Sequence, residues 1–143
     1  MRSQQGMTIL ELCAVLAVIA ILSAMAVPMY DGLVRRAQAD EARTLLHAIA
    51  HAELRHYRDR GTYLACDPGG DIPAGGGSFP NDAACWQQLG VQIDGPVRYR
   101  YAVATAGESF VATAEGDLDQ DGLISRFTLH GTDLSVETRD ELE

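Results

Sequence analysis

Residues 6–30 read GMTILELCAVLAVIAILSAMAVPMY and form the most apolar stretch of the chain. Only three side chains in residues 7–27 are polar, those of Thr8, Glu11 and Ser23. As an α-helix, residues 7–27 would be about 31 Å long, which is enough to cross the hydrocarbon core of a membrane. We therefore predict that the fold begins with a helix long and apolar enough to span a membrane.

Pro28 and Gly32 follow this apolar stretch. A proline inside a helix removes one backbone hydrogen bond, here the bond to the carbonyl of Ala24, and usually kinks the helix. Glycine adds a second flexible point. We expect the helix to continue beyond Pro28 with a bend at Pro28 and Gly32.

Residues 30–60 have the pattern of an amphipathic helix. Aliphatic and small residues recur at steps of three and four, at Val34, Ala37, Ala42, Leu45, Leu46, Ile49 and Ala52. Charged residues are expected mostly on the other side, at Arg35, Arg36, Asp40, Glu41, Arg43, Glu53, Arg55 and Arg58. Gly61 suits the C-cap position. If both stretches are continuous, residues 8–60 form one helix of about 80 Å.

The rest of the chain predicts a loop followed by an antiparallel sheet. Residues 64–90 are rich in glycine and proline, which favours a loop. Alternating apolar and polar residues predict strands near residues 97–103, 110–114, 123–129 and 134–138. One long helix followed by a sheet of three or four antiparallel strands is an α+β fold.

Charge and composition argue against some classes of function. The chain has 11 arginines and no lysine against 20 acidic residues, a formal net charge of −9. Such an acidic chain argues against nucleic acid as the main ligand. No serine or cysteine nucleophile lies in a recognisable catalytic motif, so we expect no enzyme and no required cofactor. His47 and His51 lie four residues apart and could bridge a metal ion, although a solvated or interfacial position is the simpler interpretation.

Glu11 is the most informative residue, because a carboxylate inside a membrane-spanning helix costs about 2.5–3.5 kcal/mol on insertion scales. The residues from Gly6 to Leu12, GMTILEL, together with the apolar run after them, resemble the processing signature of type IV pilins and pseudopilins. The resemblance implies that a prepilin peptidase cuts between Gly6 and Met7 and that the new amine of Met7 is methylated. It also implies that Glu11 pairs with the N-terminus of a neighbouring subunit during assembly.

The resemblance extends beyond this motif. Pro28 occupies the place of a helix-bending proline in pilins, and residues 60–63, RGTY, resemble the glycine-tyrosine stretch that often closes the pilin helix. Two features of the N-terminus depart from the family: Met7 replaces the commoner phenylalanine, and the leader carries one arginine where many carry several. The division implied is a leader at 1–6, a filament-core half-helix at 7–29, an amphipathic half-helix at 30–63, a loop at 64–90 and a β domain at 91–143.

Elementary electrostatics supports the assembly role. A buried amine and a buried carboxylate each lack solvation in a medium of low dielectric constant. Staggering one helix along another would bring the amine of Met7 to a neighbour's Glu11 and favour one axial register. A head-to-tail contact that does not close generates an open helical filament.

The resemblance implies a structural subunit, major or minor, of a type IV pilus-like filament, or fimbrium. Its expected partners are copies of itself, other pilins, the prepilin peptidase and methylase, and an inner-membrane assembly machinery. The precursor would cross the inner membrane once and then enter a periplasmic or extracellular filament. A type II secretion pseudopilin is the first alternative. A secreted calcium-binding module, released from a signal peptide after Ala26, and a plain membrane anchor are the others.

Cys66 and Cys85 would then lie in an oxidising compartment, and their glycine-rich surroundings favour a disulfide between them. The pair precedes the predicted sheet, whereas the family often has a disulfide near its C-terminus. Cys13 is expected to be a small apolar residue of the helix.

Asp117, Asp119 and Asp121 alternate along the chain and precede Gly122, as at the start of a calcium loop. The glutamate that an EF-hand requires at its twelfth position would be Thr128, so an EF-hand is excluded. An acidic turn with solvated charges is the alternative to a Ca²⁺ site, and both interpretations stay open.

Overall fold

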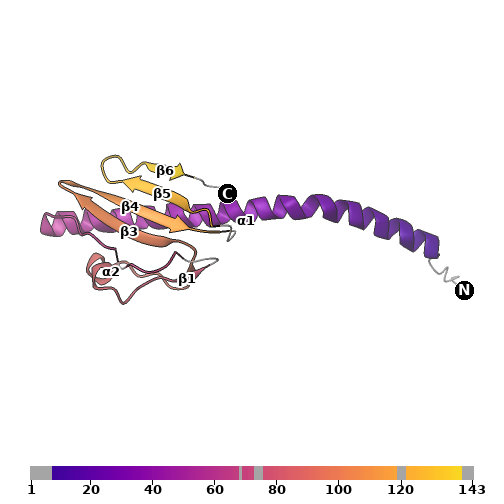
Figure 1. Ribbon diagram of the computed structural model, residues 1–143, viewed down its shortest axis with the longest axis horizontal. Helices are drawn as coiled ribbons and strands as arrows, with labels where there is room; N and C mark the ends of the chain where they lie inside the picture. Colours follow the sequence, from indigo (N-terminus) through magenta and orange to yellow (C-terminus); the bar gives the residue numbers. More distant parts are fainter. Residues whose placement is uncertain (1–7, 68, 73–75, 119–121, 140–143) are drawn as a thin grey trace, which may run out of the picture. The chain divides into compact units, whose positions relative to one another are not determined.

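The computed structural model describes residues 8–67, 69–72, 76–118 and 122–139, apart from the side chains of Pro28 and Asp31. Its elements are α1 (Ile9–Arg60), β1 (Gly77–Ser78), α2 (Ala84–Leu89), β2 (Pro96–Val97), β3 (Arg100–Ala106), β4 (Ser109–Gly116), β5 (Ser125–His130) and β6 (Val136–Arg139) (Figure 1). The predicted α+β fold is confirmed. The chain divides into two compact units, Met1–Arg35 and Arg36–Glu143, which are described in turn.

The first unit contains the start of α1. The Thr8 hydroxyl accepts the backbone N–H of Glu11 at 3.3 Å, and the Thr8 carbonyl accepts that of Leu12 at 3.1 Å. The Thr8 hydroxyl therefore caps one donor, the N–H of Glu11, that the first turn of a helix otherwise leaves unpaired, and the Thr8 carbonyl accepts the first bond of the helix. The helix continues through Pro28 and Gly32 without interruption, whereas the bend expected there stays a prediction.

In the second unit, β3, β4, β5 and β6 form an antiparallel sheet in chain order, and β1 pairs with β2 in a separate two-stranded sheet. One face of the larger sheet packs on α1 (Figure 1). The helix contributes mainly small and aliphatic buried residues, Ala39, Ala42, Leu46, Ile49, Ala50 and Ala52. Alternate strand positions contribute Tyr101, Val103, Phe110, Ala112, Ala114, Phe127 and Leu129. The two hydrophobic periods expected from the sequence, of a helix and of strands, therefore meet in one core.

Residues 64–90 differ from the loop that the sequence predicts, because they contain β1 and α2. The six-residue helix α2 buries Trp86 and Leu89 completely or nearly so. The Trp86 ring lies 5.1 Å from that of Phe79, centroid to centroid. A helix this short is not stable alone, so burial of Trp86 overrides the weak local preference.

Near the C-terminal end of α1, the prediction that Glu53 lies on the solvated side of the helix is wrong. Its side chain is fully buried. Its Oε2 atom accepts the N–H of Leu64 at 3.0 Å. His56, also buried, donates from Nδ1 to the carbonyl of Thr62 at 2.8 Å. These two side chains attach the connection after the helix to α1, and burial raises the pKa of Glu53.

Cys66 and Cys85 form a disulfide with their Cα atoms 5.4 Å apart. Cys66 also exchanges two backbone hydrogen bonds with Val103 of β3, with N–O distances of 2.8 and 2.6 Å. The disulfide therefore links α2 to a segment that already lies along the edge of the sheet.

We expect Glu53→Gln to change the pH dependence of stability. A raised carboxyl pKa means that Glu53 favours folding most at low pH and loses that contribution as pH rises through its folded-state pKa. The melting temperature of the wild type, minus that of Glu53→Gln, should therefore fall between pH 4 and pH 8. The same substitution at the exposed Glu108 serves as the control. A difference that stays constant over this range would contradict the buried ionisable role of Glu53.

Removing the disulfide should destabilise the globular unit substantially. The cysteines are 19 positions apart, and closing a loop of this size is worth about 3 kcal/mol on the chain-entropy model. Cys85→Ala should lower the free energy of unfolding in urea by about that amount, whereas Cys13→Ala, at an exposed free cysteine, should not. Intact mass of the wild type should increase by two protons on reduction, and an unchanged mass would contradict the bond.

Candidate assembly surface

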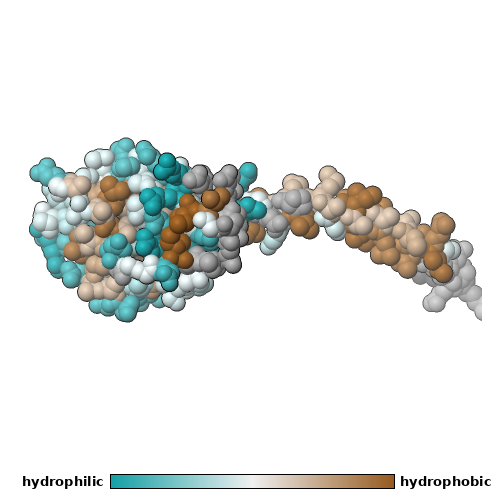
Figure 2. All heavy atoms as spheres, in the orientation of Figure 1, coloured by the Kyte–Doolittle hydropathy of each residue, from teal (hydrophilic) through white to brown (hydrophobic). Residues whose placement is uncertain are grey.

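The apolar residues of the first unit are exposed in the single chain. Large hydrophobic side chains between Ile9 and Leu33 expose from 44% of their surface at Leu12 to 83% at Ile9. Figure 2 shows hydrophobic residues along this part of α1. None of the most apolar part of this helix is buried, and its length and composition suffice to cross a membrane. Such a surface is stable in lipid or against other apolar helices, and not in water.

Glu11 lies in the first turn of this helix and is exposed. Thr8, and not Glu11, supplies the capping acceptor, so the Glu11 carboxylate is left to face outward. An acidic group in the first turn also interacts favourably with the helix dipole. The position suits contact with a positive group of another molecule.

Gly6 and Met7, the predicted cleavage site, lie outside the described residues. The structure therefore places the carboxylate of the predicted pair but not the amine. Pairing between Met7 and Glu11 of two subunits stays a prediction.

The acidic turn after β4 is described only in part. Oδ2 of Asp117 accepts the N–H of Gly122 at 3.2 Å, whereas Asp119 and Asp121 lie outside the described residues. Among the described residues, no three His, Cys, Asp or Glu side chains gather closely enough to hold a metal ion. Ca²⁺ binding at this turn stays a prediction.

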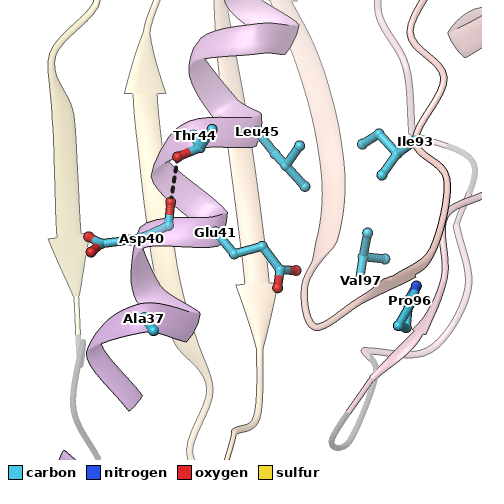
Figure 3. A pocket seen from close by; sticks show the side chains of 8 residues that line it. All are labelled: Ala37, Asp40, Glu41, Thr44, Leu45, Ile93, Pro96 and Val97. Atoms are coloured by element: carbon cyan, nitrogen blue, oxygen red, sulfur yellow. Dashed lines mark hydrogen bonds between the residues drawn. The ribbon is translucent and has the colours of Figure 1, made fainter. Parts of the chain in front are cut away.

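A groove of about 470 Å³ lies in the second unit between α1 and residues 93–97 (Figure 3). Its eight lining residues are Ala37, Asp40, Glu41, Thr44, Leu45, Ile93, Pro96 and Val97. The Glu41 carboxylate accepts the backbone N–H of Arg98 at 2.9 Å and its Nη1 at 2.8 Å. The Thr44 hydroxyl donates to the carbonyl of Asp40 at 2.8 Å. The Glu41 contacts hold the strand connection at Arg98 on the helix, whereas the Thr44 bond lies within α1.

Sequence reasoning did not identify Glu41, Glu53 or His56 as residues that hold the globular unit together. Their positions on the helix were visible, but their backbone partners at Arg98, Leu64 and Thr62 lie on segments whose path the sequence does not predict. The weak signal for Glu53 is its place between the apolar residues Ala52 and Leu54.

Comparison with curated proteins finds fimbrial proteins and type IV pilins. The chain is 38% identical over 71 residues to fimbrial protein EcpC of Eikenella corrodens, which covers 50% of this chain and 46% of that protein. It is 35% identical over 79 residues to the type IV major pilin protein PilE1 of Neisseria gonorrhoeae, a match that covers 55% of this chain and 46% of that protein. It is 49% identical over 49 residues to a fimbrial protein of Moraxella nonliquefaciens, a match that covers 34% of this chain and 32% of that protein.

The chain spans about half the length, or less, of these relatives. No family model matches it, and no solved structure matches it significantly. The chain is related to the type IV pilins and fimbrial proteins, which confirms the family resemblance seen in its sequence.

Proposed function

We propose that this chain is a structural subunit, major or minor, of a type IV pilus-like filament. The observation that carries the proposal is the exposed apolar segment of α1, none of which is buried, with Glu11 in its first turn. The named relatives, which are fimbrial proteins and type IV pilins, support a pilus subunit, and a type II secretion pseudopilin is the first alternative. The precursor crosses the inner membrane once, and the mature subunit joins a periplasmic or extracellular filament with other copies and other pilins.

Processing and assembly follow from the same segment. Prepilin peptidase cuts between Gly6 and Met7, and the amine of Met7 is methylated. In the membrane, Glu11 costs about 2.5–3.5 kcal/mol, and pairing with a neighbour's amine offsets part of that cost. When the assembly machinery extracts the subunit, neighbouring apolar helices replace lipid around residues such as Ile19 and Leu22, which expose 52% and 61% of their surfaces.

A secreted calcium-binding module released after Ala26 is the alternative from another class of function. Cleavage there would divide α1, which is continuous from Ile9 to Arg60, and would discard the exposed apolar segment. N-terminal sequencing separates the two: the mature chain begins at Met7 as a pilin subunit and at Val27 as a secreted module. Recovery of the chain in sheared surface filaments would test the filament itself.

Gly6→Val should block maturation, because the peptidase that cuts after Gly6 accommodates no larger side chain there. Full-length precursor should accumulate in the membrane fraction, as measured by immunoblot and N-terminal sequencing. Ser3→Val, which changes the same leader away from the cut, is the control. Normal maturation of Gly6→Val would contradict the proposed processing.

Glu11→Val should uncouple membrane insertion from assembly. The substitution removes the insertion cost, so the membrane fraction should hold at least as much subunit as in the wild type. The neighbour's amine loses its counter-charge, and filament yield should fall at least tenfold. Ser23→Val removes another polar group from the same segment and should leave the yield near that of the wild type. Normal filaments from Glu11→Val would exclude the proposed pairing.

A further inference from the structure

The outer face of the four-stranded sheet, opposite the face packed on α1, carries one row of charged residues across all four strands. Arg100 on β3 is the register partner of Glu115 on β4, and Glu115 is in turn the partner of Arg126 on β5. Arg126 is the partner of Arg139 on β6. We term these four residues the arginine row.

Within the row, the Glu115 carboxylate already forms ion pairs with the arginines on both sides. Its Oε2 atom accepts Nη2 of Arg100 at 2.5 Å, and its Oε1 atom forms an ion pair with Arg126. The Glu115 side chain is only 10% exposed between them, whereas that of Arg126 remains 53% exposed. Arg126 and Arg139 face each other across β5 and β6, and directly opposed like charges are unfavourable in a sheet. A further negative group placed near both arginines would relieve this repulsion.

The row is positive on a molecule that is otherwise acidic. With three arginines and one glutamate it has a net charge of +2, whereas the whole chain has −9. Glu137, on the same face, lies 3.8 Å from Nε2 of His130 and reduces this charge without reversing it. The surface elsewhere therefore carries a larger excess of carboxylates.

The surroundings of the row suit a contact between proteins. A shallow cavity of about 380 Å³ opens beside Arg126 and Arg139, and Thr128, Thr138 and one carboxylate, that of Glu137, complete its lining. Leu123 and Ile124, directly before β5, expose 49% and 44% of their surfaces. In Figure 2, which views the sheet from the side opposite α1, hydrophilic atoms lie beside a small hydrophobic patch. Arginine is enriched at protein interfaces, and apolar surface such as that of Leu123 and Ile124 is removed from water when it is covered there.

The rest of the outer face would allow close approach of another molecule. Its side chains are small at most positions of β3 and β4, at Ala102, Ala104, Ala106, Ser109 and Thr113. Beyond the arginine row, the outer face of β3 and β4 therefore carries mostly small, uncharged side chains.

We propose that the arginine row, with Leu123 and Ile124, is a docking surface for an acidic surface of a second copy of this chain. The inference rests on the proposed filament, in which every subunit meets other copies. Charge complementarity selects the occupant, since a neighbour with a net charge of −9 presents carboxylates in excess. The contact would hold globular units together in addition to the pairing of the N-terminal helices.

Photo-crosslinking in filaments of the full chain tests this surface. A photoreactive amino acid at Thr128 leaves all three arginines in place and should crosslink to an acidic segment of another copy, identified by mass spectrometry. The same amino acid at Ala104, on the far end of the outer face, should crosslink several-fold less. Arg139→Gln should reduce the Thr128 crosslink about fivefold, the effect of one surface ion pair, and Arg139→Lys should retain most of it.

Arg58→Gln is the matched control, because it removes the same charge from an exposed position of α1 and should leave the crosslink unchanged. The crosslink should also weaken as ionic strength rises. Filaments in which Thr128 crosslinks only within its own chain, for example to residues 140–143, or to a different protein would overturn the docking surface alone. Absence of the chain from filaments would instead overturn the proposed function on which it rests.

Discussion

The structure depends on one constraint, that a single continuous helix serves two environments. Between Ile9 and Leu33 its large apolar side chains have no cover within the described chain, whereas from Ala39 onward its small and aliphatic residues are buried against a sheet. Alanines at 39, 42, 50 and 52 let strands approach the helix closely, and bulkier residues there would displace them. Because the apolar segment must be covered by lipid or by other helices, the fold of one chain is incomplete without a membrane or a filament.

Much of the architecture follows from the sequence because it rests on periodicity. The pattern predicts a helix to residue 60, a closing glycine at position 61 and strands near residues 97–103, 110–114 and 123–129. The structure has α1 ending at Arg60, Gly61 with a φ of 75°, and β3, β4 and β5 within a few residues of the predicted bounds. Helix α2 was not predicted, because six residues give too little local signal and the burial of Trp86 depends on distant partners. Glu53 was misplaced for a related reason, since its partner, the N–H of Leu64, is positioned only when the chain turns back along α1.

The candidate site shows a different limit. Glu11 stands out in sequence because a carboxylate is rare in an apolar helix, and the structure adds that Thr8 performs the capping that an acidic first-turn residue could otherwise provide. Its proposed partner belongs to another subunit, so a single chain cannot contain the pair. The arginine row lay beyond sequence reasoning for a geometric reason: its alignment depends on the lengths of three turns, and a shift of one residue would move a member to the opposite face.

A filament of acidic subunits would face mutual electrostatic repulsion, which the two proposed contacts would together reduce. Each copy carries a net charge of −9, so packing copies side by side is opposed by mutual repulsion unless opposite charges meet locally. Apolar helix packing supplies attraction but little axial precision, which a buried Glu11–amine pair would add in a region that salt does not screen. The arginine row would act at the solvated globular units, where screening is strong beyond about 8 Å at physiological ionic strength. The buried pair would therefore set the register of the helices under all salt conditions, while the outer contact would tune cohesion between neighbouring units with the ionic strength of the surroundings.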